Sequence, residues 1–488
     1  MAFGLRFYGL AFPNRLMFDE TYYAKDAWTM YLFGYEKDWV EGANDQIVTG
    51  DLSGITDKTS FVVHPPLGKL LIGWGEALFG MNSFGWRIAA CVFGALLVMF
   101  TIRLARRLSR YTLVGAIAGI LLTFDGLAFV MSRIALLDIF QATFIMAAVA
   151  ALVADRDWFR HRLAGHLRDN DLPDLGGAFG PMIWWRPWRI AAGIMFGAAV
   201  AVKWNSLYVL AVFGIVTVVW DLGARRLAGA SRKAALSVVT DAPLAFIQLV
   251  VVAVPVYLTS WYSWLTTPGG WDRDFGAKNP DDPVVRFFGE ALGSLWHYHT
   301  AMYDFHTGDT INAAEHPYEA HPAGWLLMIR PIGIDAQNGI EPGEQGCTAV
   351  ETTCLRVVSG MGTPVLWWLA AAALVIAIWW WLGKRDWRFA VPVLGVMAVW
   401  LPWFQYTERP LFFFYATVLV PFYVTGLAMV LGRLLGPAAS PQRRLRAMAV
   451  GLAIALVILN FAFIYPVLTD ALMTRPEWLT RMWFGTWI

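Results

Sequence analysis

The chain has 488 residues, of which 58% are hydrophobic and 15% are charged, and its mean hydropathy is +0.51. This composition is far too apolar for a soluble protein of that length and predicts a polytopic membrane protein. The net charge is only +2, and the Lys and Arg residues lie in short scattered clusters, which excludes a nucleic-acid-binding protein with a basic footprint.

The first 85 residues precede the first complete apolar stretch. Residues 1–12 read as the last turns of a helix, so we expect that a first membrane span is missing from the N-terminus. Asp19 and Glu20 follow it. Burial and a neighbouring like charge push the pKa values of two carboxylates apart and leave one as a base. Acidic pairs are also common on solvated loops, so the pair alone is a weak signal.

A second motif, His64-Pro65-Pro66-Leu67-Gly68-Lys69, comes later in the same segment. Proline is tolerated in the first turn of a helix, and residues 67–74 predict an amphipathic helix lying in the membrane interface. His64 and Lys69 would then face lipid headgroups, where an anionic phosphate is the natural partner. Simple snorkelling explains Lys69 equally well.

Apolar stretches follow in chain order, and each is predicted to be a membrane-spanning helix, because a span must satisfy its backbone internally. The short stretches 190–202 and 204–220 could form one helix or two. Basic residues flank the outer ends of both, so the positive-inside rule predicts two helices with a turn near Lys203. The ten stretches are 86–104, 112–131, 139–154, 190–202, 204–220, 243–262, 364–382, 389–404, 411–432 and 447–468.

The same rule predicts which loops are cytoplasmic. Together with their flanking residues, five short loops hold more than half of the 38 Lys and Arg: 105–111, 155–189, 221–242, 383–388 and 433–446. We therefore expect a plasma-membrane protein whose functional loops lie on the extracytoplasmic face. Its predicted parts are an exported loop 1–85, six helices in 86–262, an exported loop 263–363, four helices in 364–468 and an exported tail 469–488.

Charged residues recur at the predicted outer ends of the spans. Ionisable groups at membrane depth usually face a cavity or each other. Four cations there, Arg87, Arg133, Lys203 and Arg409, predict a site for a lipid-linked phosphate. In a simpler alternative, Arg133 pairs with nearby Asp138.

The exported loop 263–363 contains cysteines and histidines. Cys347 and Cys354 are seven residues apart on an oxidising side, which predicts a disulfide, with two unpaired thiols as the alternative. His297 and His299 form a His-x-His pair that could bind a metal. Histidines that form hydrogen bonds in a packed loop are the commoner case, so we expect no metal.

An ordered set of motifs along nearly the whole chain resembles the protein O-mannosyltransferases. These motifs are Phe18-Asp19-Glu20, His64-Pro65-Pro66-Leu67-Gly68-Lys69-Leu70, Arg87, Ser132-Arg133-Ile134-Ala135-Leu136-Leu137-Asp138, Val202-Lys203-Trp204, His316-Pro317-Tyr318-Glu319, Arg330-Pro331, Gly362-Thr363-Pro364 and Arg409-Pro410-Leu411-Phe412. The Ala- and Arg-rich composition is similar to that of actinobacterial members.

The resemblance implies an all-α GT-C glycosyltransferase with eleven spans, ten of them complete here. It implies transfer of mannose from polyprenyl-phosphate-mannose to Ser or Thr hydroxyls of exported proteins, with inversion. Asp19 would be the general base and Glu20 would help to hold the acceptor. Cations would stabilise the phosphate as its negative charge grows. The residues implied for the phosphate are Arg87, Lys203, Arg133, His64 and Arg409, with Lys69 added from the interfacial helix.

The resemblance also implies the partners. The lipid-linked donor is a substrate, no cofactor is required, and the acceptors are Ser/Thr-rich exported proteins. We expect contact with membrane lipid, an association with the secretion machinery, and an acceptor side that includes His316, Tyr318 and Glu319. The long loop lacks the sugar-binding insert of eukaryotic members.

Two alternatives stay open. Another GT-C enzyme acting on a lipid or a cell-wall glycan would share the early acids. A secondary transporter would show inverted repeats with breaks at the bilayer midplane, and the sequence has no such repeat.

Overall fold

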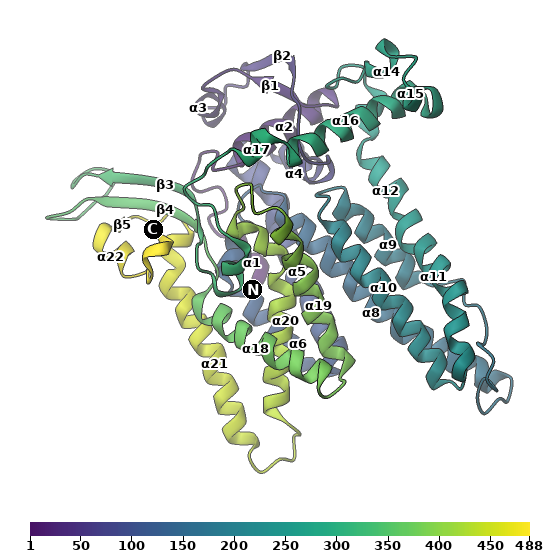
Figure 1. The fold of residues 1–488 in the computed structure, drawn as a ribbon. Coiled ribbons are helices and arrows are strands. Elements are labelled where there is room, and N and C mark those ends of the chain that lie inside the picture. Colours follow the sequence, from purple (N-terminus) through teal and green to yellow (C-terminus); the bar gives the residue numbers. More distant parts are fainter.

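The computed structural model describes residues 1–230 and 234–488. Long helices run side by side, and the segments around α2, α3 and α14–α17 lie across one end of them (Figure 1). We call this end, which carries residues 1–85 and 263–363, the loop end. The opposite end carries the connections α5–α6, α8–α9 and α20–α21, and we call it the basic end.

Apolar helices account for all ten predicted stretches. In the described residues, seven are long and apolar enough to cross a membrane: α5 (Ser83–Ser109), α8 (Asp138–Asp169), α10 (Ser206–Leu227), the run Ala234–Ser260, α18 (Pro364–Leu382), α19 with its 3-10 extension (Trp387–Gln405) and α21 with its extension (Arg443–Leu468). Three are shorter: α6 (Thr112–Thr123), α9 (Pro187–Val200) and α20 (Val420–Leu435). The predicted turn at Lys203 is confirmed, because α9 ends just before it and α10 begins just after it. The number of true spans stays a prediction.

Three of the predicted stretches are interrupted. The stretch 112–131 divides into α6 and α7 (Gly126–Met131) at Asp125, whose carboxylate accepts the N–H of Ala128 at 2.8 Å and the indole N–H of Trp367 at 2.8 Å. The run Ala234–Ser260 contains α11 (Val238–Phe246), a π-helical turn (Ile247–Val251) and α12 (Ala253–Ser260). The stretch 411–432 begins with a 3-10 helix (Phe413–Val418), and α20 starts only at Val420.

Local signals set several helix starts. The side chain of Asn82 caps α5 by accepting the N–H groups of Phe84 and Gly85 at 3.1 and 3.0 Å. Pro187 and Pro364 begin α9 and α18, where a missing N–H costs no helical hydrogen bond.

Shorter elements build the loop end. α4 (Leu67–Phe79) is the predicted amphipathic helix, and it packs between α2 (Glu20–Phe33) and α5. The small sheets are β1 (Lys37–Trp39) with β2 (Ile55–Thr59), and β3 (Ile332–Ile340), β4 (Cys354–Gly360) and β5 (Met473–Thr474) in that order, all antiparallel. Cys347 and Cys354 form a disulfide beside β4. The remaining helices are α1 (Ala2–Phe7), α3 (Ala43–Val48), α13 (Tyr262–Thr266), α14 (Phe275–Lys278), α15 (Pro283–Phe288), α16 (Glu290–Thr307), α17 (Asp309–Asn312) and α22 (Arg475–Leu479).

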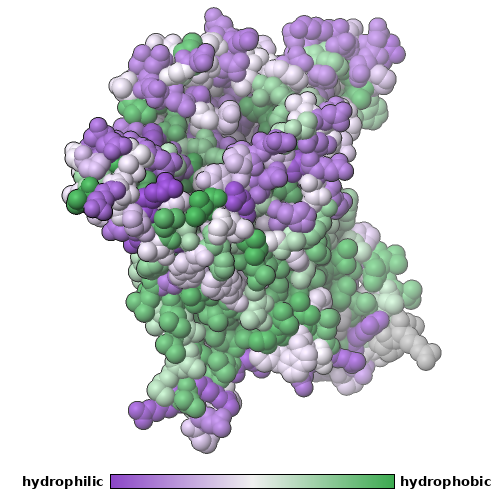
Figure 2. Space-filling model, turned by 60° about the vertical axis from the view of Figure 1, so that its left-hand side comes forward, coloured by the Kyte–Doolittle hydropathy of each residue, from purple (hydrophilic) through white to green (hydrophobic). Residues whose placement is uncertain are grey.

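The outer surface of the helices is apolar. Figure 2 shows a broad hydrophobic band between hydrophilic residues at the loop end and smaller hydrophilic clusters at the basic end. Large apolar side chains of the long helices are exposed, among them Ile215 at 68% and Val219 at 58% in α10 and Val375 at 68% in α18. An exposed apolar surface of this extent marks contact with lipid, and the chain is a multi-pass membrane protein.

Candidate active site

A cavity of about 460 Å³ opens at the loop end, where the first residues of α8 and α10 meet the C-terminal part of α16. Five segments distant in sequence contribute to its wall. Its lining residues are Val63, His64, Pro65, Asp138, Lys203, Trp204, Asn205, Leu207, Tyr208, Tyr303, His306, Thr307, Trp403, Tyr406, Arg409 and Tyr415. The sequence analysis selected His64, Lys203 and Arg409 for the phosphate site, and the structure brings these three together.

Lys203 and Asp138 form a buried ion pair in this cavity. The ammonium donates to the Asp138 carboxylate over 2.8 Å, and it faces the rings of Phe414 and Tyr415 at 5.7 and 5.4 Å from their centroids. An ammonium has three N–H donors, so the bond to Asp138 leaves others free for a ligand. Asp138 therefore orients Lys203. The alternative pairing of Asp138 with Arg133 is wrong.

Arg409 is held by a histidine. Its guanidinium lies 3.2 Å from Nδ1 of His306, and Nε2 of His306 lies 2.7 Å from the carbonyl oxygen of Val63. A carbonyl only accepts, so His306 donates from Nε2 and accepts from Arg409 at Nδ1, which is the neutral tautomer. The ring of His64 stacks on His306 with centroids 5.4 Å apart.

Both histidines stay neutral in the cavity. Burial lowers the pKa of His64 well below its usual range, and the charge of Lys203 adds to this shift. Burial also lowers the pKa of His306, and the charge of Arg409 acts in the same direction. The positive charge facing the cavity is consequently that of Lys203 and Arg409.

Asp19 lies beside this charge, at the N-cap of α2. Burial raises the pKa of its carboxyl to about 6; the positive charge of Lys203 opposes that shift, and the negative charge of Asp138 adds to it. Its side chain makes no capping hydrogen bond and is partly exposed. The residue before it, Phe18, has φ 49°, a strained value for a non-glycine residue, and its ring packs on Phe412 and Phe414. The backbone is thus forced into the turn that presents Asp19.

Glu20, the next residue, points into the protein. Its carboxylate takes a bidentate ion pair from Arg87 with both distances 2.8 Å, and it accepts the backbone N–H groups of Met17 and Ala135 at 3.0 Å. Glu20 and Arg87 are both fully buried. The guanidinium also donates to the carbonyl groups of Leu10, Pro13 and Arg15. All of its N–H groups are used inside the protein, so no donor of Arg87 faces a phosphate in this structure.

Two other predicted phosphate ligands lie outside the cavity. Arg133 donates to the carbonyl groups of Arg6, Tyr8 and Gly9, and so closes the C-terminal end of α1. Lys69 is 1% exposed and binds Glu36, with Asp26 at 3.8 Å. The predictions that Lys69 faces headgroups or snorkels are therefore wrong, because α2 and its following turn supply buried acids that α4 must neutralise.

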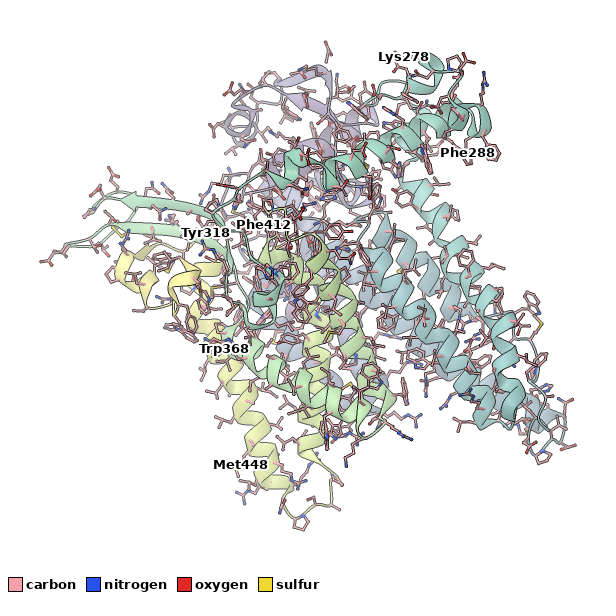
Figure 3. The ribbon with its side chains drawn as sticks, viewed as in Figure 1. Lys278, Phe288, Tyr318, Trp368, Phe412 and Met448 are labelled. Carbon is pink, nitrogen blue, oxygen red and sulfur yellow. A yellow bond between two sulfur atoms is a disulfide. The ribbon has the colours of Figure 1, made fainter. Side chains whose placement is uncertain are left out.

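The predicted acceptor residues do not line this cavity. The ring of His316 meets Phe412 edge-on at 4.9 Å, and its Nδ1 accepts the N–H of Tyr318 at 3.1 Å. Figure 3 labels Tyr318 and Phe412 close together below α17. Tyr318 lines a separate cleft of about 380 Å³ against β3, and Glu319 donates its backbone N–H to the carbonyl of His316. His316 is thus linked to Phe18, the neighbour of Asp19, through the ring of Phe412.

Several lining residues were missed by the sequence analysis. His306 is one of them, because it lies 103 residues from Arg409 in the sequence and nothing in the local pattern indicates their contact. Tyr303, Tyr406 and Tyr415 look like ordinary interfacial aromatic residues. In the described residues, no group of three or more His, Cys, Asp or Glu could hold a metal ion.

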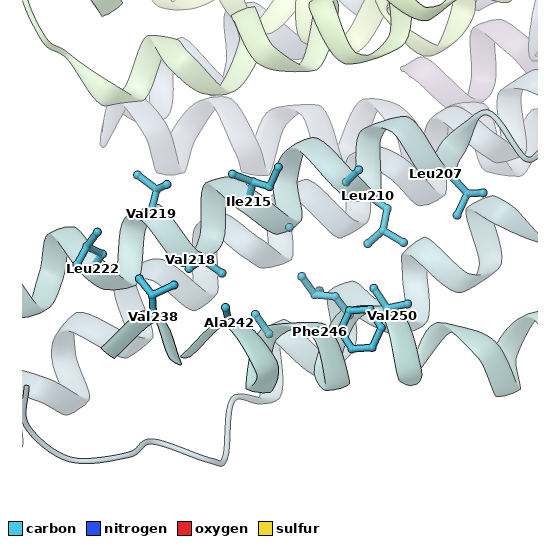
Figure 4. A pocket seen from close by; sticks show the side chains of 14 residues that line it. Leu207, Leu210, Ile215, Val218, Val219, Leu222, Val238, Ala242, Phe246 and Val250 are labelled. Carbon is cyan, nitrogen blue, oxygen red and sulfur yellow. The ribbon is translucent and has the colours of Figure 1, made fainter. Parts of the chain in front are cut away.

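An apolar groove of about 710 Å³ lies next to the cavity along the lipid-facing side of α10 (Figure 4). It runs between α10 and α11 with the π-helical turn Ile247–Val251, and Leu207 lines both the groove and the cavity. The groove is lined by Leu207, Leu210, Ala211, Gly214, Ile215, Val218, Val219, Leu222, Val238, Ala242, Ala245, Phe246, Leu249 and Val250. A cation-lined cavity therefore lies next to a slot suited to a hydrocarbon chain.

The fold is similar to those of solved membrane glycosyltransferases. The donor-bound Pmt1-Pmt2 protein O-mannosyltransferase complex of S. cerevisiae aligns with a TM-score of 0.71 at 14% identity, over 100% of this chain and 91% of that one. ArnT from Cupriavidus metallidurans aligns with a TM-score of 0.50 at 15% identity, over 96% and 74%. These likenesses show that the chain shares the fold of these membrane enzymes.

Sequence comparison then gives the family. Family models match residues 74–165 (dolichyl-phosphate-mannose-protein mannosyltransferase) and 291–487 (C-terminal four TMM region of protein-O-mannosyltransferase). Polyprenol-phosphate-mannose–protein mannosyltransferases from Mycobacterium tuberculosis CDC 1551 and Mycolicibacterium smegmatis MKD8 are 37% and 38% identical, over 96% and 99% of this chain and 86% and 90% of theirs. The relative from Corynebacterium glutamicum is 33% identical over 96% and 88%. The chain belongs to the protein O-mannosyltransferase family.

Proposed function

We propose that the chain transfers mannose from polyprenyl-phosphate-mannose to Ser or Thr hydroxyls of exported proteins, with inversion at the anomeric carbon. The observation that carries this proposal is the position of Asp19, a carboxylate with a pKa of about 6, beside a cavity that presents Lys203 and Arg409 and adjoins an apolar groove. The printed names of the mycobacterial and corynebacterial relatives agree with this donor and acceptor.

Asp19 is the general base in this mechanism. Its carboxylate accepts the proton of the acceptor hydroxyl while the oxygen attacks the anomeric carbon, and the bond from that carbon to the phosphate oxygen breaks on the opposite face. A base works best when its pKa lies near the working pH, and burial has brought Asp19 close to that range.

Lys203 and Arg409 hold the donor phosphate. Negative charge grows on the phosphate as mannose leaves, so cations fixed in advance stabilise the transition state more than the bound substrate. Asp138 fixes Lys203, and His306 fixes Arg409. His64, stacked on His306, is neutral and contributes to the wall of the phosphate site.

The apolar groove takes the polyprenyl chain of the donor. Its lining is hydrocarbon, so the polyprenyl chain exchanges contacts with membrane lipid for packing against these side chains. Because Leu207 lies in both spaces, the chain enters the groove as the phosphate reaches Lys203.

Glu20, Arg87, Arg133 and Lys69 are assigned supporting roles. Glu20 and Arg87 fix the turn that carries Asp19, Arg133 fixes α1, and Lys69 fixes α4 on α2. We assign none of them to the donor phosphate. The acceptor approaches along His316, whose ring reaches Phe412 and through it Phe18.

The active site is assigned to the extracytoplasmic face of the plasma membrane. The clustering of Lys and Arg in the loops of the basic end supports this orientation. In this orientation exported acceptors meet the loops 1–85 and 263–363 and the tail 469–488. The enzyme must then contact these proteins as they leave the secretion machinery.

The test is mannose transfer by the reconstituted full chain with polyprenyl-phosphate-mannose and a Ser/Thr-rich peptide. Asp19→Asn should lower the rate by about 10²- to 10⁴-fold, the usual contribution of a general base. Asp45→Asn, an exposed acid of the same segment, is the matched control and should keep the parent rate. Equal rates for parent and Asp19→Asn would remove Asp19 from the mechanism. Transfer to a glycan acceptor but not to the peptide would favour a different GT-C activity.

A further inference from the structure

We propose that a second cavity, at the basic end, binds an anionic phospholipid of the cytoplasmic leaflet. It has a volume of about 790 Å³ and lies between α5, α8 and α9. α5 begins at the loop end, and the arginines in the cavity belong to its last turns, so the cavity lies far from Asp19. It is separate from the donor site and uses none of its residues.

Four arginines form one wall. Arg103, Arg106 and Arg107 recur with the spacing of one helix face, Arg110 follows as the left-handed residue at the end of α5, and all four are exposed. In the described part of the chain, Arg107 is the member with a carboxylate partner, Asp157 at 3.3 Å. Asp157 is shared with Arg156, also at 3.3 Å, so the wall keeps a strong excess of positive charge.

The opposite wall is apolar and recessed. α8 presents Ala147, Ala150, Ala151 and Ala154, whose small side chains leave the space open, and α5 and α9 add Met99, Phe100 and Met195. Trp188, at the rim, is 42% exposed. Tryptophan in such a position is typical of the boundary between headgroups and hydrocarbon.

These two walls identify the ligand by its chemistry. A free anion would contact the arginines but not the apolar wall, whereas a neutral lipid would contact only the apolar wall. A phospholipid with an anionic headgroup satisfies both, with its phosphate against the guanidinium groups and its acyl chains along α8. Basic pockets between helices at the cytoplasmic side of membrane proteins have this character.

The experiment measures thermal unfolding of the full chain in detergent, with added phosphatidylglycerol, phosphatidylcholine or inorganic phosphate. A ligand that binds only the folded state raises Tm. We expect phosphatidylglycerol to raise Tm more than phosphatidylcholine does and inorganic phosphate to have no effect. The triple variant Arg103→Gln/Arg106→Gln/Arg110→Gln should lose this preference, with lipid affinity falling by about fivefold for each arginine removed.

The matched control is Arg162→Gln/Arg168→Gln/Lys384→Gln, which removes the same charge from exposed positions outside the cavity and should keep the preference. Ala151→Leu, which narrows the cavity without changing charge, should weaken phosphatidylglycerol binding measured by native mass spectrometry. Three results would overturn the proposal. Both phospholipids could raise the Tm of the parent chain equally, inorganic phosphate could raise it as much as phosphatidylglycerol does, or the control variant could lose the preference as well. Mannose transfer is not the readout, so failure here is distinct from failure of the proposed function.

Discussion

At the scale of single residues, the adjacent acids Asp19 and Glu20 have opposite surroundings. Both appear in the sequence as candidates for acid–base chemistry. Their separation depends on the first turn of α2, where Asp19 is the N-cap at the cavity and Glu20 turns inward to Arg87. The sequence pattern identifies the two acids as a candidate pair. Which of them remains available for a substrate depends on the fold, because Arg87 of α5 and the backbone N–H of Ala135 bind Glu20 and leave Asp19 unbound.

The pKa of Asp19 gives a pH prediction. Below about pH 6 its carboxyl is protonated and cannot accept the proton of a hydroxyl, so kcat/KM should fall tenfold per pH unit as the pH decreases below that value. Above it, kcat/KM should reach a plateau. Rates measured between pH 4.5 and 8 test this, with Asp45→Asn expected to keep the parent profile. If the residual activity of Asp19→Asn showed the same fall, another group would be responsible.

The buried pair Glu20–Arg87 gives a stability prediction. Glu20→Leu or Arg87→Leu alone leaves an uncompensated buried charge, and each should lower the free energy of unfolding by about 3–5 kcal/mol. The double variant should lose less than the sum of the two. It should not regain parent stability, because the carbonyl groups of Pro13 and Arg15 also lose their donor. Thermal unfolding of the three variants measures this, and simple additivity would contradict the pairing.

At the scale of elements, α4 shows what periodicity can and cannot predict. Its helical character and exposed apolar face follow from sequence, and Trp74 and Leu78 are 63% and 77% exposed. Its other face is more deeply buried than an interfacial helix requires. A Cβ added at Gly73 would lie 2.9 Å from the carbonyl oxygen of Ala27 in α2. Such close backbone approach depends on a partner 46 residues away and has no signature in the local pattern.

The same interface buries Glu76 with both carboxylate oxygens unpaired. Burial, with the charge of nearby Asp26 adding to it, raises the pKa of Glu76 well above its ordinary value of 4.5. The unfolded chain releases this proton above about pH 4.5 whereas the folded chain keeps it, so this group makes stability fall as pH rises. Glu76→Gln should therefore match the parent near pH 4 and be increasingly more stable toward pH 8. Thermal unfolding across this range tests it, with the exposed Glu41→Gln as control; a constant difference would contradict the assignment.

At the scale of the whole molecule, hydropathy and charge were sufficient to predict the order of the apolar helices and where the chain turns back between α9 and α10. They predicted the turn at Lys203, because charge at both ends of a segment constrains its direction. They did not predict the break at Asp125, since the buried acid is stabilised by Trp367 from a helix far along the chain. Likewise, three of the predicted phosphate ligands lie in the cavity, whereas Arg87, Arg133 and Lys69 are taken by partners that only the tertiary fold supplies.

The largest feature that links the membrane to the chemistry is the groove along α10, and two glycines of that helix allow a sharp test. Gly214 lines the groove, and a Cβ added there would meet no atom within 4 Å. Gly223, in the same helix, is equally open but does not line the groove. Gly214→Phe should therefore fill the groove without disturbing the packing, and Gly223→Phe should fill only lipid space.

A loss of packing contacts worth about 1.4 kcal/mol from the bound donor chain lowers kcat/KM by about tenfold. We expect this loss for Gly214→Phe with a long polyprenyl-phosphate-mannose and little loss with a donor too short to enter the groove. Gly223→Phe should keep the parent rate with both donors. An equal loss with the short donor would show that Gly214→Phe acts on the phosphate cavity instead, and no loss with the long donor would exclude the groove as the site of the polyprenyl chain.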